Sequence, residues 1–192
     1  HGEAKVLIAD REFGDVINEA VGMLDNPPQV IDVNDPEFSG AGTQVSDLDY
    51  DAFVASGDPA FDWQMPADEW DAISLCYTSG TTGRPKGAEL THANLLLNAI
   101  LSTNVITTRA DDTQLIVLPL FHIFAMTCLM NAGIYKGASS ILLPRFDAEA
   151  VLGLMQKHEV SIFAGVPTMY WGLLNYENTK FDLDSISANL RM

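Results

Sequence analysis

A segment rich in hydroxyl residues and glycines occupies residues 77–87, directly after the apolar run at 73–76, and contains a lysine, Lys86, near its end. The glycines allow positive φ angles and close approach of the backbone, the hydroxyls donate hydrogen bonds, and Lys86 supplies a positive charge. Together these groups suit the wrapping of a polyphosphate. We expect phosphate contacts from Thr78, Ser79, Gly80, Thr81, Thr82, Gly83 and Lys86.

The P-loop of nucleotide hydrolases is a rival interpretation of this loop. That motif is G-x-x-x-x-G-K-[ST], with a helix directly after the lysine. Here Gly80 and Gly83 are too close together, Pro85 precedes Lys86, and Gly87 stands where the magnesium-binding hydroxyl should be. The spacing therefore disfavours a P-loop hydrolase. A plain turn would also be rich in Gly, Ser, Thr and Pro.

Residues 77–87 resemble the signature loop of the AMP-forming adenylating superfamily, which includes acyl-CoA synthetases, luciferases and peptide-synthetase adenylation domains. Two later segments, 118–124 and 163–170, resemble the next two core motifs of that family, and all three occur in family order. A plain turn does not explain a match over this many consecutive positions.

The resemblance implies a reaction and its substrates. ATP would activate a carboxylate to an acyl-adenylate with release of pyrophosphate, and CoA would then take the acyl group. ATP, Mg²⁺ and CoA are thus implied as substrates of the full-length enzyme. His122 matches a family position that borders the carboxylate and the nucleotide, while Tyr77 and Arg84 would support the loop. A lone histidine among apolar residues is more often a core residue, so its role depends on the surrounding motif.

The acyl pocket is less well defined by the sequence. Its candidates resemble segments of fatty-acyl-CoA synthetases, and the chain looks like the medium- to long-chain branch. Ordinary core packing predicts the same apolar pattern, so both interpretations stay open, as does the preferred chain length. The candidate pocket residues are Phe121, Phe124, Gly165, Val166, Met169 and Tyr170.

Several later family motifs are not found in residues 1–192: the Tyr-Gly-x-Thr-Glu segment, the ribose-binding aspartate and the lysine of the C-terminal lid domain. We therefore expect an interior fragment that is inactive alone, and no residue is assigned as catalytic. The alternative is a stand-alone polyphosphate- or nucleotide-binding module. A further hypothesis is a chimera joined near Gly87, because residues before it resemble the medium-chain and acetyl-like branch and later residues the bacterial long-chain branch.

Composition narrows the class of protein. The chain has 192 residues, 47% of them hydrophobic, and no apolar run as long as the roughly 18 residues that a membrane helix needs. Peripheral membrane contact and the oligomeric state stay open. Residues 1–71 carry a net charge of −15 and the rest −1, which disfavours nucleic acid as a partner. A cytoplasmic location and two reduced thiols, Cys76 and Cys128, are expected.

Predicted strands and helices alternate along the chain, so we expect an α/β fold with a mostly parallel sheet and flanking helices. The family resemblance implies that this is part of the large N-terminal domain of an acyl-CoA synthetase-like fold. The phosphate loop, His122 and the 165–167 turn should meet beyond the carboxyl ends of strands. We expect an acidic segment at 1–72 and a phosphate-loop and acyl-pocket portion at 73–192. Predicted strands lie at 6–9, 30–33, 73–77, 115–120, 139–143 and 160–164, and predicted helices at 12–24, 48–56, 91–105, 123–135, from 147, and 167–174.

Overall fold

The structure is a computed structural model that describes residues 2–79, 83–177 and 179–191. The chain divides into two compact units, residues 1–65 and 66–192, and each is described by itself. The first unit is a small α/β element, and the second carries the motifs.

Two parallel strands form the centre of the first unit. Between them the chain makes a short 3-10 helix and an α-helix, in place of the single helix predicted at 12–24, and Asn26, Pro27 and Pro28 follow. These elements are β1 (Val6–Asp10), η1 (Arg11–Phe13), α1 (Gly14–Gly22), β2 (Gln29–Val33) and α2 (Tyr50–Ala55).

A buried carboxylate, that of Asp32 on β2, ties this unit to its long loop. Its Oδ2 accepts a hydrogen bond from Arg11 Nε at 2.6 Å, and its Oδ1 accepts one from the backbone N–H of Val45 at 2.9 Å. A buried charge needs such partners to be tolerated. The loop that contains Val45 is therefore held against β2 at a defined point.

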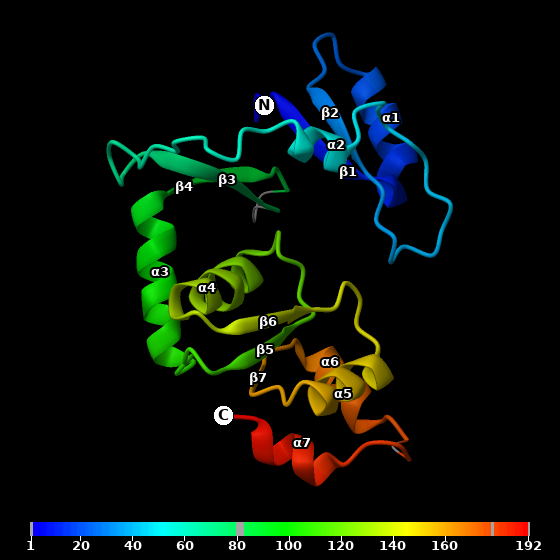
Figure 1. The fold of residues 1–192 in the computed structure, drawn as a ribbon, viewed down its shortest axis with the longest axis vertical. Helices are drawn as coiled ribbons and strands as arrows, with labels where there is room; N and C mark the ends of the chain where they lie inside the picture. The colour runs from blue at the N-terminus through cyan, green and yellow to red at the C-terminus, as the bar shows by residue number, and fades with distance from the viewer. Residues whose placement is uncertain (1, 80–82, 178, 192) are drawn as a thin grey trace. The chain divides into compact units, whose positions relative to one another are not determined.

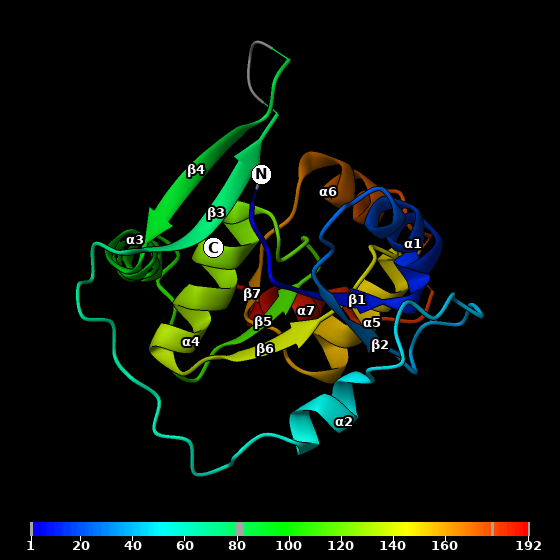
Figure 2. The same cartoon turned by 90° about the horizontal axis from the view of Figure 1, so that it is seen from above.

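In the second unit, an antiparallel hairpin is formed by β3 (Ala72–Thr78) and β4 (Lys86–Thr91). Residues 77–87, which we call the phosphate motif, begin in β3 and end in β4. Figure 2 shows the two strands side by side. The strand predicted at 73–77 is confirmed, but its expected burial was wrong, since Ile73, Leu75 and Tyr77 are each at least 40% exposed. The strand β4 was missed because its Gly, Ala and Glu have low strand propensity.

The helix that follows begins where the sequence predicted. Thr91 is its N-cap: the Thr91 hydroxyl accepts from the Asn94 N–H at 3.0 Å, and the Asn94 side chain accepts from the Thr91 N–H at 3.2 Å. This reciprocal pair satisfies two backbone donors that a helix start leaves free. The helix is α3 (His92–Val105), which packs against the segment 125–136.

A three-stranded parallel sheet, in the order β6–β5–β7, is the centre of the second unit. Figure 1 shows α4 on one face of this sheet and α5 on the other. Pro119, which has no N–H to donate, follows the end of β5, which is shorter than predicted. The elements are β5 (Thr113–Ile116), α4 (Ala132–Lys136), β6 (Ser139–Leu142), α5 (Ala148–Lys157), β7 (Ile162–Phe163), α6 (Pro167–Leu174) and α7 (Leu183–Asn189).

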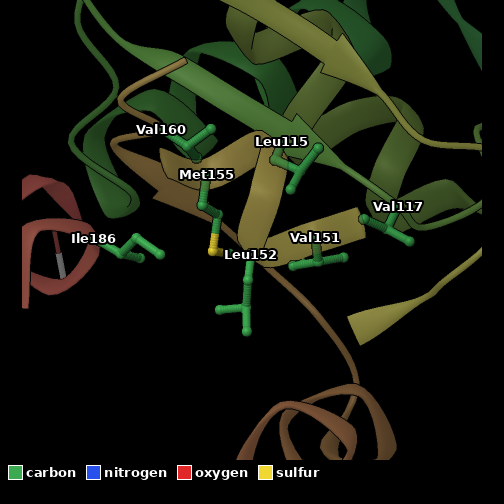
Figure 3. Packing of buried hydrophobic residues seen from close by; sticks show 7 residues of the cluster. All are labelled: Leu115, Val117, Val151, Leu152, Met155, Val160 and Ile186. Atoms are coloured by element: carbon green, nitrogen blue, oxygen red, sulfur yellow. The ribbon is translucent and has the colours of Figure 1, made fainter. Parts of the chain in front are cut away.

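The hydrophobic core lies between this sheet and α5. Figure 3 shows the core side chains, which come from β5 and the segment after it, from α5, from the segment before β7 and from α7. Asp147 caps α5 by accepting from the Ala150 N–H at 2.8 Å, which starts the helix with its apolar face toward the sheet. The core residues are Leu115, Val117, Val151, Leu152, Met155, Val160 and Ile186.

An exposed ion pair joins α5 to the segment between α6 and α7. Glu149 accepts hydrogen bonds from Lys180 Nζ at 2.5 Å and from the Tyr176 hydroxyl at 3.0 Å. These two donors lower the pKa of Glu149 below its usual value, and the Glu149 carboxylate raises the pKa of Lys180. The pair thus loses its attraction only in strong acid or strong base.

The segment predicted as one α-helix at 123–135 is instead a π-helix, η2 (Ala125–Asn131), followed by α4. Gln114 of β5, which is 2% exposed, reaches into this segment. Its Nε2 donates to the Leu129 carbonyl at 3.0 Å and to the Ser140 hydroxyl at 2.7 Å. Apolar periodicity alone does not distinguish this π-helix from an α-helix.

Gly133 leaves the space that this glutamine occupies, so Gly133→Ala should destabilise the second unit. An added Cβ would lie 2.1 Å from Gln114 Nε2, and Gln114 is held by its two hydrogen bonds. We expect a loss of about 1–3 kcal/mol in the free energy of unfolding, from overpacking or broken hydrogen bonds. Denaturant titration followed by circular dichroism measures it.

Gly153→Ala is the matched control for this prediction. A Cβ at that position of α5 would lie 3.5 Å from Phe181, an ordinary contact. Because alanine favours a helix over glycine, this variant should gain roughly 0.5–1 kcal/mol. Equal stability of the two variants would contradict the close packing of Gln114 on Gly133.

Candidate functional site

A cleft of about 680 Å³ lies between β3 and the segment after β5. Thr78 and Ser79, the first hydroxyl residues of the phosphate motif, form part of its wall, and His122 lies across from them. The cleft is lined by Ser74, Leu75, Cys76, Tyr77, Thr78, Ser79, Phe121, His122, Ile123 and Met126.

The hairpin geometry places Lys86 beside Thr78. Lys86 is the antiparallel partner of Thr78, and directly opposite residues carry their side chains on the same face, with Cβ atoms about 4.5–5.5 Å apart. Gly83, between them, has a φ of 78°, a conformation that glycine adopts without strain. Gly80, Thr81 and Thr82 lie outside the described residues. The motif thus returns on itself, so that its lysine and its first hydroxyls lie together.

His122 has one defined hydrogen-bond partner on its ring. Its Nδ1 accepts from the backbone N–H of Phe124 at 3.3 Å. A neutral imidazole that accepts at Nδ1 carries its proton on Nε2. The exposed ring therefore presents an N–H donor, which suits a carboxylate or phosphate oxygen.

A second cleft, of about 480 Å³, is almost wholly apolar and shares His122 with the first. Residues 165–167 form its other wall, at the carboxyl end of β7 and the start of α6. Pro167 occupies the first turn of α6, as predicted. The lining residues are Leu118, Pro119, His122, Phe124, Gly165, Val166, Pro167 and Met169.

The structure distributes the predicted acyl-pocket residues over two places. Phe124, Gly165, Val166 and Met169 line the apolar cleft, whereas Phe121, 88% exposed, lines the cleft beside the phosphate motif. Tyr170 packs its ring edge-to-face against Phe163, with centroids 5.7 Å apart, and its hydroxyl accepts from the Gly165 N–H at 3.3 Å. Tyr170 therefore supports the wall of the apolar cleft from behind.

Sequence reasoning missed some lining residues. Ser74 and Cys76 line the cleft beside the phosphate motif, and they are the half-buried residues that alternate with exposed ones along β3. Leu118 and Pro119 line the apolar cleft, and the motif that includes them could have identified them. Both cysteines are half-buried free thiols, as expected.

The expectation that all three motifs lie beyond the carboxyl ends of one open sheet was wrong in part. The segments with His122 and Gly165 do follow the parallel strands β5 and β7. The phosphate motif instead connects the strands of the separate antiparallel hairpin. An antiparallel hairpin can be joined by a short loop, whereas parallel strands need a longer crossover.

Within the described ranges 2–79, 83–177 and 179–191, no group of three or more His, Cys, Asp or Glu side chains could hold a metal ion. The same ranges contain no helix that is both long and apolar enough to cross a membrane.

A scan of protein families matches the AMP-binding enzyme model over residues 1–192. The chain belongs to the AMP-binding enzyme family. The resemblance drawn from the three motifs is confirmed, and the match covers both units.

Relatives of known activity are CoA ligases. The chain is 36% identical over 183 residues to 3-methylmercaptopropionyl-CoA ligase of Ruegeria pomeroyi, covering 91% of this chain and 32% of that protein. It is 39% identical over 125 residues to long-chain-fatty-acid–CoA ligase of Bacillus subtilis, covering 64% and 22%. The chain thus spans about a third or less of the length of these two curated relatives.

A solved structure confirms the fold. The anthranilate CoA ligase AuaEII in complex with anthranoyl-AMP superimposes with a TM-score of 0.79 at 28% identity, over 98% of this chain and 35% of that one. The predicted α/β fold, part of the large N-terminal domain of an acyl-CoA ligase, is therefore confirmed.

Proposed function

We propose that this chain belongs to an AMP-forming fatty-acid–CoA ligase and supplies the pyrophosphate side and part of the acyl side of its active site. The observation that carries the proposal is that one imidazole, His122, borders both clefts. One cleft carries the hydroxyls of the phosphate motif, and the other is apolar. A carboxylate whose chain lies in the apolar cleft would reach the phosphate cleft at His122.

The residues of this chain have distinct tasks in such a reaction. Lys86 and the hydroxyls of Thr78 and Ser79 stabilise the negative charge that builds on the leaving pyrophosphate. His122, with its proton on Nε2, donates to the carboxylate or to the α-phosphate and so orients the two reactants. The apolar cleft holds the acyl chain and excludes water. Mg²⁺, if it accompanies ATP, supplies further charge neutralisation when bound.

Relatives support a fatty acid as substrate. The Bacillus subtilis relative is a long-chain-fatty-acid–CoA ligase, and a 32% identical relative of Ectopseudomonas oleovorans is a medium-chain-fatty-acid–CoA ligase. The nearly wholly apolar lining of the second cleft fits an alkyl chain better than a polar acid. The proposal also includes CoA as the acceptor of the acyl group and a cytoplasmic location. It further divides the chain into an acidic segment at 1–72 and a phosphate-loop and acyl-pocket portion at 73–192.

ATP–pyrophosphate exchange on the whole protein tests the proposal, with acetate, hexanoate, decanoate and palmitate as acids. Exchange should depend on a fatty acid. His122→Ala should lower kcat/KM by about tenfold, the value of one hydrogen bond to a charged group. His158→Ala, which removes an exposed histidine at the end of α5, is the control and should leave exchange unchanged. ATP binding without exchange for any acid would favour the alternative, a polyphosphate- or nucleotide-binding module.

A further inference from the structure

The π-helix η2 lies between His122 and α4 in the chain. Its register therefore sets the direction of His122 relative to α4. An α-helix has 3.6 residues per turn, so a change of one residue in register rotates the preceding segment by about 100°. If residues 125–131 reverted to an α-helix, residues 121–124 would rotate by that amount relative to α4. His122 and Phe124 would then leave the clefts that they line.

A side chain from the sheet enters this helix at the π turn. The Leu129 carbonyl accepts from Gln114 Nε2 at 3.0 Å and also receives the Ala132 N–H. Insertion of a side-chain donor into the helical ladder is a recognised cause of local departure from α geometry. Gln114 is 2% exposed and has no route to the reacting groups. The same Nε2 also donates to the Ser140 hydroxyl at 2.7 Å.

Hydrogen bonds connect this point to His122. The Ala132 N–H also bonds to the Thr127 carbonyl, the Thr127 hydroxyl donates to the Ile123 carbonyl at 2.7 Å, and the Met126 N–H donates to the His122 carbonyl at 3.0 Å. The segment from His122 to Ala132 is therefore continuous, and a change at Leu129 must move its start.

We propose that Gln114 is a positioning residue for His122: its bond to the Leu129 carbonyl keeps residues 125–131 in the π register that presents the imidazole to both clefts. The functional consequence rests on the proposed function, whereas the structural one does not. Gln114 itself touches no substrate. Its effect is to set the ring so that Nδ1 accepts from the Phe124 N–H and Nε2 keeps the proton.

The test replaces Gln114 and watches the His122 ring. The chain has four histidines, so long-range ¹H–¹⁵N spectra of their rings are simple, and the signal that is lost in His122→Ala assigns His122. At about pH 8, the wild-type His122 signal should show the Nε2–H tautomer. Gln114→Met, which keeps the length but removes the donor, should shift this signal toward an average of both tautomers.

Ser140→Ala is the matched control, because it removes the other partner of Gln114 and keeps the Leu129 bond. It should leave the His122 signal unchanged even if both variants lose similar stability. If Gln114→Met fails to fold, Gln114→Met combined with Ser140→Ala leaves no unpaired hydroxyl and carries the test. An unchanged His122 signal in the folded Gln114 variants, or an equal shift in Ser140→Ala, would overturn the proposal.

Kinetics on the whole protein give a second readout. Gln114→Met should lower kcat/KM for exchange by about tenfold through misplacement of the ring, and His122→Ala added to it should cost little more. Fully additive losses would contradict an action through His122. If no variant and no wild-type protein exchanges pyrophosphate, the proposed function fails, while the ring spectra still decide the role of Gln114.

Discussion

Replacement of Asp112 with alanine should destabilise the second unit strongly, and by more than Gly133→Ala does. Asp112 is 1% exposed and precedes β5. Its carboxylate accepts from the Arg109 N–H at 2.6 Å and from the Ser161 hydroxyl at 2.6 Å, and it pairs with the Arg191 guanidinium. The backbone carbonyl of Asp112 accepts from the Ser139 N–H at the start of β6, and that of Thr113 accepts from the Ser161 N–H just before β7. The carboxylate therefore ties the start of β5 to Ser161, just before β7, and to Arg191.

The expected loss is about 3–5 kcal/mol in the free energy of unfolding, because the change leaves a partly buried guanidinium without its buried partner and removes the shorter of the two hydrogen bonds of the Ser161 hydroxyl. Denaturant unfolding of the variant and the wild-type chain measures it. Asp111→Ala is the control: its side chain is 81% exposed and lies 3.9 Å from Arg191, so its loss should be about 0–1 kcal/mol. Equal losses for the two neighbours would show that the network does not carry the stability of the sheet.

Lys86→Ala should have the largest effect on activity. Lys86 lies opposite Thr78 on the hairpin, beside the cleft that we assign to the phosphates of ATP. Loss of a charge-assisted contact of roughly 1.5–3 kcal/mol should lower kcat/KM for ATP in pyrophosphate exchange by about 10–150-fold. The KM for the fatty acid should change much less, because the apolar cleft does not include Lys86.

Lys157→Ala removes the same charge from the exposed end of α5 and should leave the kinetics unchanged. A similar loss in both variants would mean that general electrostatic attraction of ATP, and not a local contact, explains the effect. A larger change in the KM for the fatty acid than for ATP would contradict the assignment of the two clefts.

Local patterns were sufficient for much of the fold. The cap residues Thr91, Asp147 and Pro167 predicted the starts of α3, α5 and α6, because capping depends on groups within one turn. Gly137, with a φ of 76°, ends α4 in the left-handed conformation that glycine adopts without strain. The family could also be recognised from the sequence, since each of the three motifs is a run of consecutive residues and the motifs occur in family order.

The sequence by itself determined the family, the α/β class and the residues of the phosphate motif, because each of these is a property of neighbouring positions. The tertiary structure alone decided that the motif sits on an antiparallel hairpin, that residues 125–131 wind as a π-helix and that His122 borders two clefts. The reason is physical: strand pairing, the bond from Gln114 to Leu129 and the convergence of separate segments on one histidine depend on contacts between residues distant in the chain.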